Sequence, residues 1–276
     1  MYLYQFEAFT TPCELHIEAI CNTSADCAAQ IVMTYAKQLE YSYGFFRKTS
    51  DVYAINHRSK NSHIISDEFA GLIKMALFYN KVTCGIFDIA LSGTLKASLN
   101  SSSLEEYQQH RNELLPFASC EHISLEGNCL SFSNAFTKMD LGGLVKEYAV
   151  DQAVLQLQNL GIKSALINFG GDIAAYGTCH GNPWKIGIQN PDDSDSNLIE
   201  VVLNDGSVCT SGHSKRYTTI ENENITHIIS ASQSYASSTQ ISVVAPTTLD
   251  AGIWSTVLLI KQDLILPAHI QLVHNV

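Results

Sequence analysis

The stretch Met139–Asp151, with the sequence MDLGGLVKEYAVD, decides how the rest of the chain is interpreted. Its two glycines, Gly142 and Gly143, stand before an amphipathic helical pattern that ends near Gly161. Backbone N–H groups at such a turn can approach an anion, and the helix N-terminus favours negative charge there. Lys146 adds a cation one turn into the helix. A phosphate-binding turn and a tight turn followed by a solvated lysine explain this pattern equally well.

Strand patterns lie on both sides of this helix. Residues 120–139 predict a hairpin, and the short apolar run Ser164–Phe169 is typical of a buried strand. The order strand, helix, strand resembles a βαβ crossover, whereas the hairpins favour antiparallel pairing. We therefore predict an α+β fold with a mixed sheet and helices packed on it. A first strand pattern over 1–20 is interrupted at Ala8–Pro12, where we expect a bend or bulge.

Length and composition predict one folded unit with a large core. The chain has 276 residues, of which 46% are hydrophobic and 16% charged. We expect a single domain over residues 1–276 with a polar surface insertion near 96–118. The formal net charge of −11 argues against a nucleic-acid partner, which needs a basic face. A phosphate ligand would therefore be held by backbone amides and a few cations, or by a metal.

Cysteine usage and the start of the chain bear on its compartment. The eight cysteines form no C-x-x-C pair and have no zinc-type spacing, so we expect buried free thiols and a reducing compartment. The N-terminus reads as a strand rather than a signal peptide, and no apolar run is long enough to cross a membrane. A cytoplasmic protein is expected, or a periplasmic or membrane-anchored one if a leader has been removed.

Two further segments carry groups suited to a ligand. The interrupted first strand could present the ring of Phe9 and the hydroxyl of Thr10. The segment Gly85–Asp88 places an aromatic ring and a carboxylate in a loop after a helix. Asp88 is equally well explained as a helix cap.

Taken in chain order, these segments resemble the ApbE family, the FAD:protein FMN transferases, over nearly the whole chain. The match through Asp140–Asp172 is close. The matching segments are Ala8–Cys13, Gly85–Asp88, Asp140–Asp151, Asn168–Asp172, Thr210–Gly212, His227–Ile229 and Ala251–Thr256.

The resemblance implies a fold, a reaction and roles for particular residues. The fold would be ApbE-like and T-fold-related, with a smaller helical and loop subdomain. The enzyme would cleave FAD with Mg²⁺, attach FMN to a threonine hydroxyl of an acceptor flavoprotein of the redox-complex subunit type, and release AMP. His227 would be the catalytic residue and Gly143, Thr256 and Asp250 the metal ligands. The FAD-binding residues would be Phe9, Thr10, Phe87, Asp88, Lys146, Thr210, Ser211, Gly212 and Ile228.

This chemistry suits an acidic protein. A hard cation with oxygen ligands neutralises the pyrophosphate of FAD and stabilises charge on the transferred phosphoryl group. A histidine with a pKa near neutrality suits proton transfer to or from the reacting oxygens.

The chain departs from the family pattern at three places. The last family segment is Ala-Asp-x-x-x-Thr, with the aspartate on the metal, but Gly252 stands at that position here. Asp250 lies two residues earlier, about 200° around a helix, so it would reach the ion only from a distorted first turn. Of the pattern His-x-x-Asp-Pro-x-Thr-Gly only the histidine remains, with Ser230 in place of the aspartate. Phe9 replaces a methionine, although its ring can still stack on a flavin or adenine.

Two functions follow from this mixture. One is an active, magnesium-dependent FMN transferase. The other is an ApbE-like protein that binds or hydrolyses FAD through a degenerate metal site, without transfer. His213, the other histidine near these segments, is expected to be a solvated loop residue rather than a pocket residue.

Overall fold

The computed structural model describes residues 1–191, 193, 195–213, 217–233, 235 and 237–275. The helices are α1 (Asn22–Tyr43), α2 (Asp51–Asn56), α3 (Asp67–Val82), α4 (Ile89–Leu95), α5 (Leu104–Leu114), α6 (Val145–Asn159) and α7 (Thr248–Ile260). The strands are β1 (Tyr2–Ala8), β2 (Thr11–Glu18), β3 (Ser62–Ile64), β4 (Ile123–Glu126), β5 (Cys129–Phe132), β6 (Ser164–Phe169), β7 (Asp172–Tyr176), β8 (Trp184–Gln189), β9 (Asn197–Leu203), β10 (Gly206–Gly212), β11 (Tyr217–Ile220), β12 (Glu223–Thr226), β13 (Gln240–Ala245) and β14 (Gln271–Asn275).

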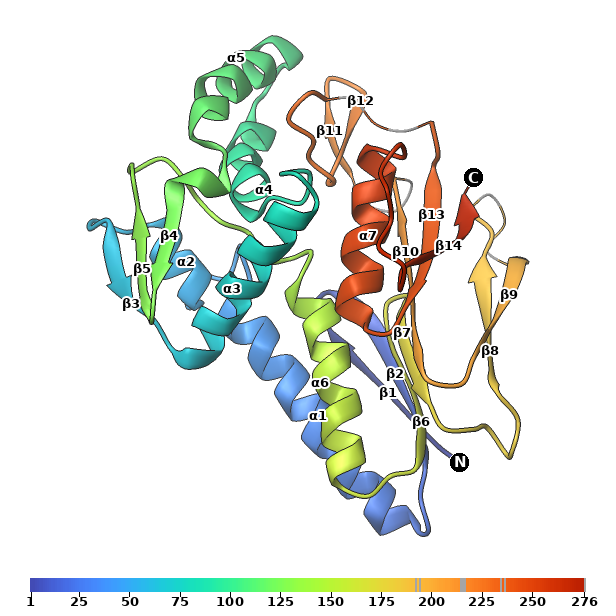
Figure 1. Ribbon diagram of the computed structural model, residues 1–276. Helices are drawn as coiled ribbons and strands as arrows, with labels where there is room; N and C mark the ends of the chain where they lie inside the picture. Colours follow the sequence, from blue (N-terminus) through green and yellow to red (C-terminus); the bar gives the residue numbers. More distant parts are fainter. Residues whose placement is uncertain (192, 194, 214–216, 234, 236, 276) are drawn as a thin grey trace.

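A seven-stranded sheet in the order β1-β2-β6-β7-β10-β13-β14 forms the centre of the fold, with α1, α6 and α7 beside it (Figure 1). The α+β class is confirmed. Every neighbouring pair of strands in this sheet is antiparallel, so the expectation of a mixed sheet with a βαβ crossover is wrong. The physical reason is that β5, which precedes α6, pairs with β3 and β4 in a separate small sheet.

The first two strands form a tight hairpin rather than one bent strand. Their register runs from Tyr2 opposite Ile17 to Ala8 opposite Thr11, which leaves two turn residues. Those residues, Phe9 and Thr10, have φ angles of 54° and 58°. Two successive positive φ angles match the twist of a two-residue hairpin turn. The expected bend or bulge is therefore a chain reversal, which brings β2 beside β6.

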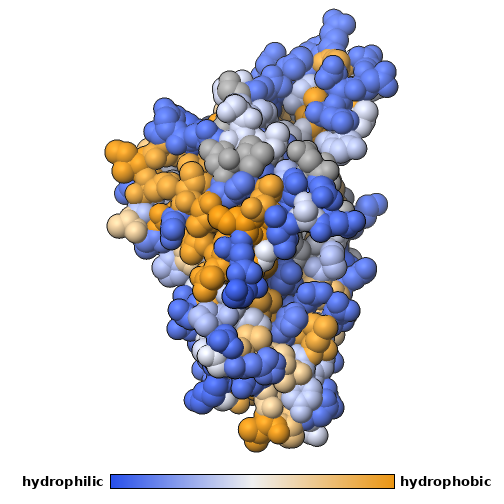
Figure 2. Space-filling view, turned by 90° about the vertical axis from the view of Figure 1, so that its right-hand side faces the viewer, coloured by the Kyte–Doolittle hydropathy of each residue, from blue (hydrophilic) through white to orange (hydrophobic). Residues whose placement is uncertain are grey.

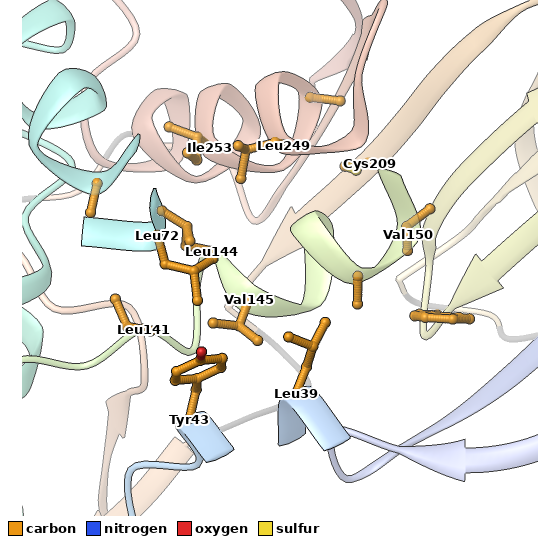
Figure 3. Close-up of a cluster of buried hydrophobic side chains, with 14 of the residues drawn as sticks. Leu39, Tyr43, Leu72, Leu141, Leu144, Val145, Val150, Cys209, Leu249 and Ile253 are labelled. Carbon is orange, nitrogen blue, oxygen red and sulfur yellow. The ribbon is translucent and has the colours of Figure 1, made fainter. Parts of the chain in front are cut away.

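Helix α6 lies in the middle of the helical layer. Figure 3 shows apolar side chains from α1, α3, α6 and α7 meeting around its first turns. Leu144 and Val150 are completely buried there, and each buried side chain of this size stabilises the fold by roughly 1.5–3 kcal/mol. The helix ends as its sequence predicts, because Gly161 takes a φ of 80° and the N–H of Ile162 bonds back to the carbonyl of Leu157 at 3.1 Å.

The ribbon of β8 and β9 adds a second, smaller core. Alternate side chains of these strands, including Trp184 and Ile186, pack with Leu166 and Val208 of the central sheet. The other side of the ribbon faces solvent. Figure 2, which looks onto the side of the molecule where β8, β9 and β14 lie, shows apolar side chains gathered on the surface. Exposed apolar residues of β9 and β14 are Leu198, Ile199, Val202 and Leu272.

The polar segment 96–118 is more than a surface insertion. It contains α5 between two short 3₁₀ turns, and most of its charged side chains are exposed as expected. Tyr107 and Arg111, however, are buried. The helix therefore packs on the rest of the fold through one face. Arg111 on this face bonds to the carbonyls of Ser230 and Ala231.

The cysteines are all free, but only part of the expectation about them holds. Cys13, Cys120 and Cys209 are buried, whereas Cys21, Cys27 and Cys84 are exposed. Within the described ranges, no helix has both the length and the apolar character needed to span a membrane.

Candidate functional site

The glycine turn before α6 is held by buried groups. The N–H of Gly142 donates to Oδ1 of Asp140 at 2.9 Å, and the other oxygen of Asp140 pairs with Lys96. A Cβ at Gly143 would lie at ordinary contact distance, 3.7 Å, from the ring of Phe87. The structure thus brings two predicted site segments, Gly85–Asp88 and the glycine turn, against each other.

Lys146 does not extend into solvent. Its ammonium group pairs with Asp172 at the start of β7 and lies 3.6 Å from Oε1 of Glu147, and its side chain is only 15% exposed. The carbonyl of Phe169 is 3.5 Å away. The alternative of a solvated lysine is therefore wrong. Among the residues that the structure describes, one cation faces two carboxylates here, which leaves an excess of negative charge.

Glu147 fills the space beside Gly252. A Cβ on Gly252 would lie 2.5 Å from Cγ of Glu147 and 3.3 Å from its Oε1. The Glu147 side chain is 9% exposed, and its Oε2 is buried with no hydrogen-bond partner in the described part of the chain. A buried carboxylate oxygen without a partner is costly, so it marks a place where a cation fits.

Helices α6 and α7 are aligned by a cap. Asp151 of α6 accepts hydrogen bonds from the N–H groups of Thr248 at 2.7 Å and Leu249 at 3.0 Å, in the first turn of α7. Burial raises the pKa of Asp151, and these two bonds oppose that rise. Residues four apart share a helix face, so Glu147 lies one turn from Asp151 and faces Gly252.

Next along the same face of α7, the end of β10 meets the helix. The hydroxyl of Ser211 is 3.0 Å from Oγ1 of Thr256 and 2.8 Å from Oγ of Ser255. Thr210 bonds to Ser242 at 2.8 Å on the neighbouring strand, and a Cβ at Gly212 would press on the carbonyl of Thr239 at 3.2 Å. Two predicted site segments, Thr210–Gly212 and Ala251–Thr256, are thus in contact.

The hairpin turn lies over β6. The ring of Phe9 stacks on that of Phe169 with centroids 6.3 Å apart, and the Thr10 hydroxyl bonds to the carbonyl of Phe9 at 2.7 Å. Gly170 has a φ of 65°, and a Cβ there would collide with the Thr11 hydroxyl at 2.2 Å. Because Phe169 also contacts Lys146, the turn adjoins the buried ion cluster.

Asp88 acts as a helix cap. Its Oδ1 accepts the N–H groups of Ala90 at 2.7 Å and Leu91 at 2.9 Å, which start α4. Its Oδ2 accepts the N–H of Cys120 at 3.0 Å and the side-chain amide of Asn80 at 3.2 Å. The cap interpretation is confirmed. Contact between Asp88 and FAD remains a prediction. The carboxylate of Asp88 already accepts hydrogen bonds from four nitrogen donors.

Asp250 is bonded away from Thr256. Its carboxylate accepts the Tyr79 hydroxyl at 2.8 Å and the Thr247 hydroxyl at 3.0 Å, and Nε2 of His269 lies 3.7 Å away. Burial raises the pKa of Tyr79, and the hydrogen bond to Asp250 raises it further, so the phenol remains a donor at neutral pH. The first turn of α7 is regular, with Thr247 as its cap, and does not show the distortion that metal binding by Asp250 would require.

His227 lies at an exposed bend after β12. The segment that follows it is held in place by hydrogen bonds from α5. The guanidinium group of Arg111 donates to the carbonyls of Ser230 and, at 2.9 Å, Ala231. Ile228 is buried, and its carbonyl accepts the Tyr235 hydroxyl at 2.8 Å. No pattern in the sequence predicts this use of Arg111. An arginine within an otherwise polar helix carries no local signal of burial.

His213 is not the solvated residue that was expected. Its Nδ1 is 3.1 Å from the Thr226 hydroxyl, and its ring packs edge-on against Tyr235 at 5.0 Å. Burial lowers the pKa of His213, and its Nε2 is buried without a partner among the described residues. The closeness of β10 to β12, which no local pattern predicts, encloses this ring.

The donor set fits a cation that also binds a ligand. Over the described ranges, no group of three or more His, Cys, Asp or Glu side chains forms a complete metal site. Burial raises the pKa of Cys209 well above its usual value, so this thiol is protonated at neutral pH. The unpartnered oxygen of Glu147, the Thr256 hydroxyl and the excess negative charge fit a hard cation completed by ligand oxygens.

The model of the ApbE family matches residues 9–271. The chain belongs to the ApbE family. Relatives named FAD:protein FMN transferase include those of Haemophilus influenzae, 26% identical over 80% of this chain and 68% of the relative, and Klebsiella pneumoniae, 25% identical over 94% and 82%. For a third, from Vibrio cholerae, the values are 26% identity, 67% of this chain and 57% of the relative.

Solved structures agree on the ApbE fold. The ApbE protein of Thermotoga maritima superposes with a TM-score of 0.84 at 22% identity and covers 94% of this chain and 86% of that one. The flavin transferase ApbE of Vibrio cholerae superposes with a TM-score of 0.77 at 20% identity and the same coverages.

Proposed function

We propose that this chain is an FAD:protein FMN transferase. The observation that carries the proposal is the contact of Ser211 with Thr256. It joins the family segments Thr210–Gly212 and Ala251–Thr256 next to the buried ion pair of Lys146 and Asp172. The relatives' shared name supports the same reaction. FAD would lie along the Phe9 turn, Phe87 and the end of β10, with its pyrophosphate near Lys146.

The reaction transfers a phosphoryl group that carries riboflavin. The acceptor threonine oxygen forms a bond to the FMN phosphorus while the bond between that phosphorus and the AMP oxygen breaks. His227 takes the threonine proton, and AMP leaves. Mg²⁺, held by Thr256, the Gly143 carbonyl and a carboxylate, would supply neutralising charge to the pyrophosphate when bound.

The test is release of AMP from FAD. Purified protein is incubated with FAD and Mg²⁺, nucleotides are separated by chromatography, and covalent flavin on added acceptor proteins is detected by fluorescence after denaturing electrophoresis. His227→Ala should lower AMP release by at least about 100-fold, the lower range for loss of a general base. Full activity in this variant would exclude His227 as the catalytic residue.

A second candidate function is FAD binding, with or without hydrolysis, but without transfer. The observation that favours it is Ser230, which is buried and leaves no carboxylate at the family position after His227 to orient the imidazole. Quenching of flavin fluorescence without FMN transfer would support this candidate. Absence of FAD binding at about 100 μM, within the usual range of enzyme substrates, would reject both.

A further inference from the structure

Helix α7 lacks the aspartate that the family uses as a metal ligand, and the structure shows what occupies that place. The Cβ that any other residue would have at Gly252 coincides with the Glu147 side chain, 2.5 Å from Cγ. Glu147 comes from α6, directly after Lys146. A carboxylate is thus present at this position, although it comes from the opposite helix.

We propose that Glu147 supplies the metal-binding carboxylate in place of an aspartate at Gly252. The proposal rests on the proposed function, because the cation is the one that would accompany FAD. Gly252 is required in this arrangement since its missing side chain makes room for the glutamate. The two positions act as a reciprocal pair across α6 and α7.

The position of Glu147 relative to Thr256 supports the assignment. Gly252 and Thr256 are four residues apart, so they share one face of α7 about 6 Å apart along the axis. The Asp151 cap fixes this register by bonding the N–H groups of Thr248 and Leu249 one turn before Gly252. The Glu147 carboxylate and the Thr256 hydroxyl therefore lie one turn apart along the same seam.

The bonding of Glu147 supports it as well. Oε1 faces Lys146 at 3.6 Å, while Oε2 is buried and has no hydrogen-bond partner in the described ranges. An unpaired buried oxygen costs about 1–3 kcal/mol, a cost that a bound cation would offset. Asp172 pairs with the same lysine, so a divalent cation would find an excess of negative charge among the described side chains.

Asp250 is the competing ligand, and its contacts argue against it. Both its carboxylate oxygens have hydroxyl partners, Tyr79 and Thr247, on the side of α7 that Thr256 does not share. Moving Asp250 to the Glu147 side would break the cap contact of α7.

The experiment measures metal binding itself. Mn²⁺ binding is followed by loss of the free-ion EPR signal and Mg²⁺ binding by calorimetry, each with and without FAD. Glu147→Gln, which keeps the shape of the side chain, should weaken binding of both ions at least about tenfold, the smallest cost usual for a metal-site group. The exposed Glu105 on α5 gives the matched control Glu105→Gln, which should bind as the unaltered protein does.

A double variant tests the proposal by a gain of metal binding and not only by its loss. Glu147→Gly combined with Gly252→Asp returns the carboxylate to α7 and should restore metal binding above that of Glu147→Gln. Wild-type metal affinity in Glu147→Gln overturns the proposal. Loss of binding in Asp250→Asn but not in Glu147→Gln overturns it in favour of Asp250.

Flavin fluorescence separates this proposal from the proposed function. Glu147→Gln should still quench FAD fluorescence in EDTA as the unaltered protein does. Failure of the unaltered protein to bind FAD would reject the proposed function. FAD binding and AMP release with unchanged metal affinity in Glu147→Gln would reject only the role of Glu147.

Discussion

Asp88 illustrates how a single residue in a family segment can be committed to the fold. Its oxygens start α4 and also tie that helix to the N–H of Cys120. Asp88→Ala should lower the free energy of unfolding by about 2–4 kcal/mol, combining a lost cap with an unpaired buried N–H. Chemical denaturation measures this loss.

Asp88→Asn is the matched variant at this position. Asparagine caps helices as well as aspartate does, but its amide nitrogen cannot accept the N–H of Cys120, so this variant should recover only about 1 kcal/mol of the stability that Asp88→Ala loses. Unchanged stability in Asp88→Ala would contradict the cap role. A fall in FAD affinity in Asp88→Asn, measured at a temperature where this variant is fully folded, would support the contact with FAD that the family resemblance implies.

Helix α5 shows how an element can position a site without entering it. Arg111 reaches two carbonyls in the segment after His227, and Glu221 accepts the N–H of Leu104 at 3.0 Å at the other end of the same helix. Arg111→Met keeps the apolar stem but removes the donors. It should lower the free energy of unfolding by about 2–3 kcal/mol and reduce AMP release, because two carbonyls lose a charged partner.

The binding of FAD separates this effect from a general loss of the site. Arg111→Met should change the Kd for FAD, measured by quenching of flavin fluorescence, by less than about twofold. The reason is that Arg111 does not contact Lys146 or Phe9. Arg111→Lys, which keeps the charge without the planar fork, should be intermediate. If Arg111→Met leaves both stability and AMP release unchanged, the anchoring role is wrong.

The molecule as a whole places its candidate site where distant segments meet. The hairpin turn, the start of α6, the end of β10 and α7 all converge beside the central sheet (Figure 1). A ligand held by all of them should stabilise the whole fold. At 100-fold excess over Kd, FAD with Mg²⁺ should add about 2.7 kcal/mol and raise Tm by roughly 5–10 °C.

Circular dichroism follows this shift without interference from flavin fluorescence. Riboflavin, which lacks the pyrophosphate, should give a smaller rise at equal concentration, because Lys146 and the cation would have no phosphate to bind. An unchanged Tm with saturating FAD and Mg²⁺ would show that the converging segments do not form the binding site.

Local sequence determined much of this protein. The helix after the glycine turn, its end at Gly161, the buried strand Ser164–Phe169 and the α+β class all follow from patterns within a few residues. Such features depend on periodicity, caps and turn chemistry, which neighbours along the chain encode.

Only the tertiary structure decided how these pieces pair. The sheet is antiparallel, and Asp250 bonds to Tyr79. The ring of His213 packs against Tyr235, and Arg111 bonds to the segment after His227. Glu147 lies in the space that Gly252 leaves open. The physical reason is that each of these contacts joins residues far apart in sequence, so strand register and helix packing determine them rather than local pattern.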